Sequence, residues 1–330
     1  MSEHYLKSLF DPQSIVLIGA STRRDTLGKL MFDQLSPDFK GNLYLVNPHH
    51  QNIDGIKCHK KIKNLPEGIN LAIVVTPVKT VVEVFRNCAD KGIENVLLMT
   101  NLQHKKPAKI VRIKKDIIKI AKEHNIRILG PSASALIRTT SQLNASFSTN
   151  QIHPGKLALV TRSKTLCNTI LDWADKHEIG FSSVISHVEE LDLSLSDILE
   201  FLINDYRTSS IVLHLDEIHH SRRFMSALRA AAIRKPVVLL KSSHDAGCYS
   251  DAIAKTSDVR SMDDVFHAAV TRAGADRVYT LSGLFSAAKI LASNQRTQGT
   301  RLGIISNGEG PIMLANDRLS FFGIEIAKLS

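Results

Sequence analysis

Short apolar runs alternate with amphipathic stretches along most of the chain. The first run, Ser14–Ile18, passes into a turn of small residues, Gly19–Ser21, and a helical pattern follows over residues 27–35. Strands that alternate with helices at this spacing predict a parallel, doubly wound α/β sheet. Further strands of this first half are expected at Leu43–Val46, Ile69–Val75, Asn95–Met99 and Ile126–Leu129.

The residues directly after these strands are candidate binding positions, because ligands of such sheets bind beyond the carboxyl ends of the strands. A turn of small residues lets a phosphate approach the backbone, and a helix N-terminus adds unpaired N–H groups and a positive dipole. Gly28 follows the turn without a full G-x-G-x-x-G motif, so the turn is also compatible with an ordinary parallel strand. The positions selected by this argument are Gly19, Ala20, Ser21, Asn47, Thr76, Pro77, Thr100, Asn101 and Ser132.

A polar and weakly periodic segment divides the chain. Because Ser132 to Pro154 is rich in Ser, Thr and Asn, we expect a linker over residues 136–154, between domains at 1–135 and 155–282. A third strand–helix–strand pattern covers residues 299–330. One such unit cannot bury both faces of a sheet, so we expect it to be incomplete, or to dock on the preceding domain.

The second domain opens with a strand and a polar turn. Lys156–Val160 is the expected strand, and Ser163, Lys164 and Thr165 form the turn before a helix over residues 166–177. Ser163 is well placed to cap that helix, because a hydroxyl oxygen can accept from the free N–H groups of the first helical turn.

Composition and charge exclude several classes of protein. The chain has 330 residues, a formal net charge of +10 and only 5% aromatic residues, without a nucleic-acid-binding signature. Much of the basic excess lies in Lys57–Lys63 and in Lys105–Lys122, where lysines oppose an apolar helical stripe, as on a solvated helix face. No apolar run suits a membrane span and no leader pattern opens the chain, so a cytoplasmic protein is expected. Its 4 cysteines lack metal-ligand spacing, so no metal is expected.

Several short motifs in a consistent order resemble a known family. The chain resembles the CoA-binding, alpha half of NDP-forming acyl-CoA synthetases, relatives of succinyl-CoA synthetase. The resemblance is closer to the degenerate synthetase region of bacterial protein lysine acetyltransferases fused to a GNAT domain. The motifs are Ser14–Ser21, Val46–Pro48, Leu129–Pro131, Leu143–Ser148, Asn168–Ala174, Gly180–Ser182 and Ser306–Gly308.

The resemblance implies a Rossmann-like CoA-binding domain, a flavodoxin-like domain of the succinyl-CoA synthetase type and a truncated third α/β unit. It implies coenzyme A or an acyl-CoA as ligand. It also implies an ATP-grasp or acetyltransferase partner chain, with a homo-oligomer also possible. In the CoA site it places Gly19, Ala20, Ser21, Thr22 and Arg23 on the phosphates, with Asn47, Thr76, Pro77 and Ser132 lining the same cleft.

The sequence departs from the family at its catalytic centre. Lys255 stands where the family has a histidine that carries a phosphoryl group, and a protonated lysine is a poor substitute for a neutral imidazole. Lys164 replaces a glycine whose backbone would face that phosphate. Asp216 replaces the glutamate that orients the histidine. His244 and His267 are the candidates to replace the missing histidine, but neither lies in the motif.

These departures favour a CoA-binding or acyl-CoA-binding module without an intact catalytic residue, as the regulatory part or a truncated relative of a protein lysine acetyltransferase. One alternative is an active alpha-type half of an ADP-forming or GDP-forming acyl-CoA synthetase, with a separate ATP-grasp partner. Another is a non-catalytic scaffold whose basic surface binds acidic partners. An NAD-dependent dehydrogenase is disfavoured, because Asn47 and Pro48 stand where an acidic residue would contact the ribose.

Overall fold

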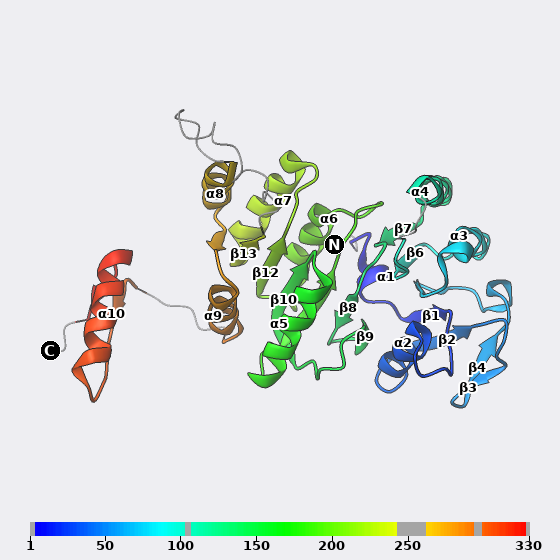
Figure 1. Cartoon of the computed structure of the whole chain (residues 1–330), viewed down its shortest axis with the longest axis horizontal. Coiled ribbons are helices and arrows are strands. Elements are labelled where there is room, and N and C mark those ends of the chain that lie inside the picture. Colours follow the sequence, from blue (N-terminus) through cyan, green and yellow to red (C-terminus); the bar gives the residue numbers. More distant parts are fainter. Residues whose placement is uncertain (1–3, 103–106, 243–261, 294–298, 328–330) are drawn as a thin grey trace. The chain divides into compact units, whose positions relative to one another are not determined.

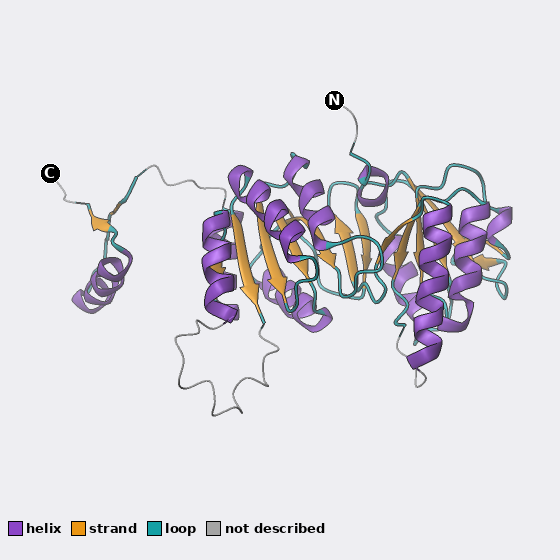
Figure 2. Ribbon diagram, turned by 90° about the horizontal axis from the view of Figure 1, so that it is seen from above, coloured by secondary structure: helices purple, strands orange, loops and turns teal. Residues whose placement is uncertain are grey.

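The computed structural model describes residues 4–102, 107–242, 262–293 and 299–327 (Figure 1). The chain divides into two compact units, residues 1–292 and 293–330. The first unit contains two sheets with helices on both faces of the strands (Figure 2). In the described residues, no helix is long and apolar enough to cross a membrane.

The first sheet is the doubly wound sheet that the sequence predicts. Its seven strands have the order β3-β4-β2-β1-β5-β6-β7, parallel except for the β3–β4 hairpin. The strands are β1 (Ser14–Ile18), β2 (Asn42–Val46), β3 (Asn52–Ile53), β4 (Ile56–His59), β5 (Leu71–Val74), β6 (Asn95–Leu98) and β7 (Arg127–Leu129). The helical elements are α1 (Lys7–Phe10), α2 (Leu27–Leu35), η1 (Ile62–Asn64), η2 (Val78–Thr80), α3 (Val81–Asp90) and α4 (Pro107–Glu123).

Alternate residues along the strands of the first sheet pack into two different apolar cores. Val16 and Val74 face a core that includes α3 and α4, while Ile15 and Leu17 face the core that includes α2. In α4 the isoleucines at 110, 113 and 117 are buried, which confirms the predicted amphipathic helix with its lysines outward. A strand covered on both faces is apolar along most of its length, and β1 is buried throughout, with Ser14 as its one polar residue.

The second sheet also has seven strands, in the order β14-β13-β12-β10-β11-β8-β9. The strands are β8 (Ala135–Arg138), β9 (Leu143–Ser146), β10 (Pro154–Thr161), β11 (Phe181–Ser186), β12 (Ser210–Leu215), β13 (Val237–Lys241) and β14 (Asp276–Val278). The helices are α5 (Lys164–Lys176), α6 (Leu195–Asn204), α7 (Ser221–Arg234), α8 (Met262–Ala273) and α9 (Leu281–Ala292).

The expected linker at 136–154 is wrong over much of its length. Its residues form most of β8 and all of β9, two antiparallel strands at the edge of the second sheet. Leu143 and Ala145 of β9 are fully buried in the core that also holds Met31 of α2. This segment therefore packs the two sheets together instead of separating them.

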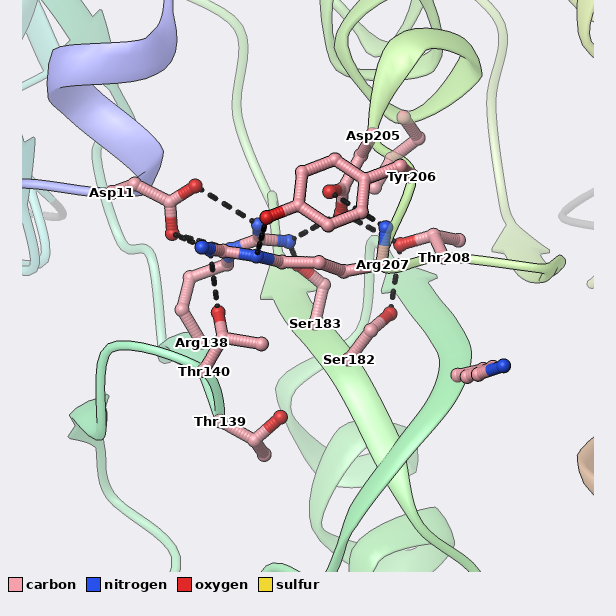
Figure 3. Close-up of polar contacts among 12 residues, drawn as sticks. Asp11, Arg138, Thr139, Thr140, Ser182, Ser183, Asp205, Tyr206, Arg207 and Thr208 are labelled. Carbon is pink, nitrogen blue, oxygen red and sulfur yellow. Dashed lines mark hydrogen bonds and ion pairs between the residues drawn. The ribbon is translucent and has the colours of Figure 1, made fainter.

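One charged residue of this segment, Arg138, belongs to a buried ionic cluster. Arg138 of β8 has no exposed surface, and it donates to Asp205 at 2.8 Å, to Ser183 at 2.8 Å and to Asp11 at 3.1 Å (Figure 3). Arg207 adds a second guanidinium on Asp11, at 3.2 Å. A charge in the interior is tolerated only when it is paired and hydrogen-bonded, and the two carboxylates supply those partners.

The second unit is a single strand–helix–strand motif, as predicted. It consists of β15 (Arg301–Leu302), α10 (Glu309–Phe322) and β16 (Glu325–Ile326), with the two strands parallel. Gly323 ends α10 in the left-handed conformation, at φ 65°, which suits glycine.

Candidate functional site

The turn after β1 is built around two glycines. Gly19 has φ 102°, a conformation that other residues rarely adopt, and its N–H donates to the Val46 carbonyl at 2.9 Å. A β-carbon on Gly28 would lie 2.0 Å from the Gly19 carbonyl oxygen. Gly28 therefore allows helix α2 to pack directly against the turn, and the structure assigns it to packing.

The loop between this turn and α2 is held by its own hydrogen bonds. The Ser21 hydroxyl accepts from the Arg23 N–H at 3.1 Å. Thr26 is the N-cap of α2, with its hydroxyl accepting from the Lys29 N–H at 3.2 Å and donating to the Arg23 carbonyl at 2.8 Å. Helix α2 begins at Leu27, as the sequence predicts, and Thr22 and Arg23 are exposed in the loop before it.

The other predicted residues lie at the same edge of the sheet. Asn47 after β2 donates from Nδ2 to the Ala20 carbonyl at 2.6 Å, which ties the end of β2 to the turn. After β5, the Thr76 carbonyl accepts from the Thr100 hydroxyl at 2.8 Å, while the Thr76 hydroxyl is buried without a hydrogen-bond partner among the described residues. Pro77 is exposed beside it.

Ser132 closes the opposite side of this edge, after β7. It is 8% exposed and adopts φ 60°. Its hydroxyl donates to Asn101 Oδ1 at 3.3 Å, and its N–H donates to the Thr100 carbonyl at 3.2 Å. Because β2, β1, β5, β6 and β7 are consecutive neighbours, the structure brings the predicted positions together along one edge, which we call the first-sheet edge.

The chemistry of the first-sheet edge suits binding more than catalysis. It offers backbone N–H groups, hydroxyls, an amide and the exposed basic side chains of Arg23 and Arg24. Such groups match a phosphorylated ligand. Among the residues that the structure describes, no group of three or more His, Cys, Asp and Glu side chains is placed to hold a metal ion.

The carboxyl ends of the strands of the second sheet, which we call the second-sheet edge, carry a different set of polar and charged side chains. Ser163 caps α5, as predicted, with its hydroxyl accepting from the Leu166 N–H at 3.3 Å. Lys164 is the first residue of that helix, and burial lowers the pKa of its ammonium. Thr165 is exposed.

Arg162 organises this second-sheet edge, and sequence reasoning missed it. Its guanidinium is 6% exposed, with Nε 2.7 Å from Asp216 Oδ1 and Nη1 donating to Glu190 Oε1 at 3.0 Å. Asp216, predicted to stand in for an orienting glutamate, is therefore held by a cation from the neighbouring strand end. Arg162 and Asp216 directly follow β10 and β12, so their nearness could be inferred once the strand order is known.

Two histidines also lie at the second-sheet edge and were not predicted. His187 is fully buried, and its burial together with the Arg162 charge lowers its pKa to about 4. His214 links Thr161 and Ser242, at 3.1 Å from Nδ1 to Oγ1 and 2.7 Å from Nε2 to Oγ; burial lowers its pKa as well. Both are therefore neutral near pH 7.

Some sequence predictions are not addressed by this geometry. Lys255 and His244 lie outside the described residues, so the substitution at the phosphohistidine position stays a prediction from the sequence. His267 is on α8, where its Nδ1 lies 3.1 Å from the Tyr279 hydroxyl.

Comparisons with known proteins agree with this two-sheet arrangement. Residues 13–138 match the family described as a CoA binding domain, and residues 154–291 match the succinyl-CoA ligase like flavodoxin domain. The expected fold is confirmed: a Rossmann-like CoA-binding domain is followed by a flavodoxin-like domain of the succinyl-CoA ligase type.

Several similar curated proteins are named as ADP-forming ligases. The chain is 28% identical over 326 residues to the Pyrococcus furiosus acetate–CoA ligase [ADP-forming] I subunit alpha, covering 97% of this chain and 71% of the relative. It is 30% identical over 325 residues to the Methanocaldococcus jannaschii acetate–CoA ligase [ADP-forming], covering 98% of this chain and 46% of the relative. The chain thus spans about half the length of that ligase.

A solved structure has the same fold over nearly the whole chain. The dinucleotide-forming acetyl-coenzyme A synthetase 1 of Ca. Korarchaeum cryptofilum, in complex with phosphate and ADP, superimposes with a TM-score of 0.89 at 25% identity. The match covers 99% of this chain and 71% of that chain. These comparisons support the ligase resemblance, and the resemblance to GNAT-fused acetyltransferases stays a prediction.

Proposed function

We propose that this chain is the CoA-binding, alpha-type part of an ADP-forming acyl-CoA ligase or of a close relative, and that it binds CoA or an acyl-CoA at the first-sheet edge. One observation carries the proposal. Gly28 lets α2 pack against the Gly19 turn, and Asn47, Thr76 and Ser132 line the same edge. Backbone N–H groups beside exposed arginines suit the phosphates of a CoA-type ligand.

The similar proteins support a partner as well as a ligand. The Pyrococcus furiosus relative is named as an alpha subunit, so a second chain completes that ligase. By analogy, an ATP-grasp partner would supply the nucleotide-dependent half of the reaction here. In the net reaction, the terminal phosphoryl group of ATP would pass to the carboxylic acid and leave ADP, and the CoA thiol held by this chain would then displace phosphate to form the thioester.

A second candidate is a protein that binds a CoA thioester but does not transfer phosphate. The Arg162–Asp216 ion pair favours it, because a carboxylate held by a guanidinium is less available to orient a phosphorylated histidine. Lys164 adds a side chain at the turn where the family has glycine, and Lys255 replaces the histidine in the sequence. A regulatory part of an acetyltransferase-type protein is one form of this second candidate. A non-catalytic interaction scaffold, which needs no CoA site, is a separate alternative.

Calorimetric titration with CoA, acetyl-CoA and NAD tests the ligand. In Gly19→Glu, a carboxylate side chain at φ 102° would fill the turn beside Thr76 and repel phosphate. We expect CoA and acetyl-CoA to bind the unmodified chain and the control Gly303→Glu, where open space surrounds the site, but not Gly19→Glu. A circular dichroism spectrum checks that the variant is folded. Failure of CoA compounds to bind the unmodified chain at millimolar concentration overturns the proposal.

Phosphate transfer separates the two candidates. The chain is incubated with labelled ATP and a candidate ATP-grasp partner, beside the Pyrococcus furiosus alpha subunit with its own partner as a positive control. Acid-labile label on this chain would support the active ligase and exclude the second candidate. Label on the control alone would support binding without phosphate transfer.

A further inference from the structure

The loop between β11 and α6 contacts the second-sheet edge and also β7, the outermost strand of the first sheet. We call residues 187–194 the bridging loop. At its beginning it holds Arg162: Glu190 Oε1 accepts from Nη1 at 3.0 Å, and the Val188 carbonyl accepts from Nη2 at 3.4 Å. The His187 N–H donates to the Thr161 carbonyl at 2.8 Å. This half of the loop is therefore part of the second-sheet edge.

The other half of the bridging loop is bound to the first sheet. Asp192 Oδ2 accepts from Arg127 Nε at 2.8 Å and from the Ile128 N–H at 2.9 Å. The Leu193 N–H donates to the Ile128 carbonyl at 3.3 Å, so the loop continues the hydrogen bonding along β7. Ser132 follows β7 closely in the chain, at the first-sheet edge.

Two further contacts fix the middle of the loop. Glu189 forms an ion pair with Lys114 of α4, and Leu191 packs against the core beneath that helix. Residues 187, 188 and 190 thus contact the second domain, whereas residues 189, 191, 192 and 193 contact the first. The loop cannot shift at β7 without disturbing the residues that hold Arg162.

We infer that the bridging loop couples the occupancy of the first-sheet edge to the arrangement of the second-sheet edge, with Asp192 as the positioning residue. The two arrangements differ at Arg162, which is either shared between Glu190 and Asp216 or held by Asp216 alone. A ligand that orders β7 and Ser132 favours the shared arrangement, because Asp192 then holds the loop in place. The inference rests on the proposed binding of CoA.

Burial makes this coupling strong enough to measure. Arg162 is 6% exposed, so loss of Glu190 leaves a nearly buried cation with one carboxylate fewer. The population of the shared arrangement and the order of the loop therefore rise and fall together. Since coupling is reciprocal, Glu190→Gln should weaken CoA binding about fivefold or more, although Glu190 lies at the other edge.

Hydrogen exchange of the full chain, with and without CoA, tests the inference. We expect CoA to slow exchange in residues 19–26 and 130–134, and also in 161–163 and 187–194. In Asp192→Ala, the slowing at 19–26 should persist while that at 161–163 and 187–194 is lost. The matched control is Asp172→Ala, which removes an exposed aspartate paired with Lys176 on α5 and should behave as the unmodified chain.

The conservative variant Asp192→Asn keeps an oxygen for the Ile128 N–H and should recover part of the effect. If Asp192→Ala does not fold, Glu190→Gln interrupts the loop at its other end and should abolish the slowing at 161–163. Slowing at 19–26 without slowing at 187–194 in the unmodified chain overturns the coupling and leaves CoA binding intact. No slowing at 19–26 overturns both.

Discussion

At the scale of single residues, Gly28 illustrates what a local pattern can reveal. The sequence placed it near a phosphate-binding turn. In the structure it has a packing role, because a β-carbon added to Gly28 would lie 2.0 Å from the Gly19 carbonyl oxygen. Spacing identifies the turn, because strand, turn and helix are consecutive in the chain. Which glycine faces a ligand and which one faces the helix depends on how α2 lies against β1, and the sequence does not state that.

Gly28→Ala should therefore destabilise the first unit and weaken CoA binding together. A methyl group that cannot fit against a backbone carbonyl forces α2 away from the turn, at a cost of about 1–3 kcal/mol in the free energy of unfolding. Urea unfolding and calorimetry measure the two effects. Gly310→Ala, in α10 with nothing within 4 Å of the added β-carbon, is the control. Normal stability of Gly28→Ala would contradict the packing role.

His187 has a lowered pKa that no sequence motif predicts. Burial and then the Arg162 charge lower its pKa to about 4 when the chain folds, and the Asp197 charge opposes this shift. The unfolded chain then binds more protons than the folded chain between about pH 4 and pH 6.5. Stability from this group is fully present above pH 6.5 and falls as the pH is lowered towards 4.

Between pH 7.5 and pH 5, this linkage should cost the folded state about 2 kcal/mol. Urea unfolding at the two pH values should show a smaller loss in His187→Gln than in the unmodified chain. The exposed His219→Gln should keep the full loss, and the contributions of His4 and His214 cancel in the comparison. Equal pH dependence in all three proteins would show that His187 titrates normally.

At the scale of elements, the sequence reveals strands that are apolar throughout and misses strands that carry buried polar or charged side chains. β5 is Leu-Ala-Ile-Val and entirely buried, so its pattern is plain. β8 and β9 lie in a weakly periodic segment rich in Ser, Thr and Asn, so this segment was predicted as a linker, and β8 also ends in a charged residue, Arg138. The partners that make Arg138 acceptable inside, Asp11 and Asp205, are remote in sequence and meet it only in the folded chain.

The two candidate sites also differ in how far the sequence predicts them. The first-sheet edge could be predicted, because parallel strands place their carboxyl ends on one side whatever their order. The ion pairs of Arg162 could not, since Glu190 lies on a loop and Asp216 follows another strand, and only tertiary packing brings them within 3.0 Å of the guanidinium. Connectivity is local information, whereas charge pairing between distant segments is not.

Arg138→Met should be more destabilising than Arg207→Met, the other arginine substitution in the buried ionic cluster. It leaves the nearly buried carboxylate of Asp205 without its cation, which costs about 3–5 kcal/mol in the free energy of unfolding. Arg207→Met removes a partly exposed guanidinium from Asp11 and should cost less than about 1 kcal/mol (Figure 3).

Urea unfolding measures both variants, and adding Asp205→Asn to Arg138→Met should restore part of the loss, because the stranded charge is removed. An Arg138→Met variant as stable as Arg207→Met would mean that the cluster does not hold β8 in place.

At the scale of the whole molecule, apolar burial is concentrated in the first unit. The three cores of the described residues lie within residues 1–292. In the second unit, Leu319 is buried, whereas Met313, Leu314, Phe321 and Phe322 are each at least 65% exposed. Such apolar exposure on so small a unit favours self-association.

A chain cut after Ser293 should therefore keep the stability of the first unit and lose much of the exposed apolar surface. Trp173 is the single tryptophan, and it stacks on Phe285 of α9 with ring centroids 4.4 Å apart, so its fluorescence reports on the first unit. Urea unfolding followed at Trp173 should agree with the full chain within about 0.5 kcal/mol. Binding of an apolar dye should fall.

A cut after Thr280 is the matched control. It removes α9, and with it Leu284, Ala288 and the Phe285 ring from the core beside α5, so the unfolding transition should move to clearly lower urea. CoA affinity should be unchanged by the cut after Ser293, because the first-sheet edge lies wholly within the first unit. If that cut destabilises the chain as much as the cut after Thr280, the two units do not fold independently.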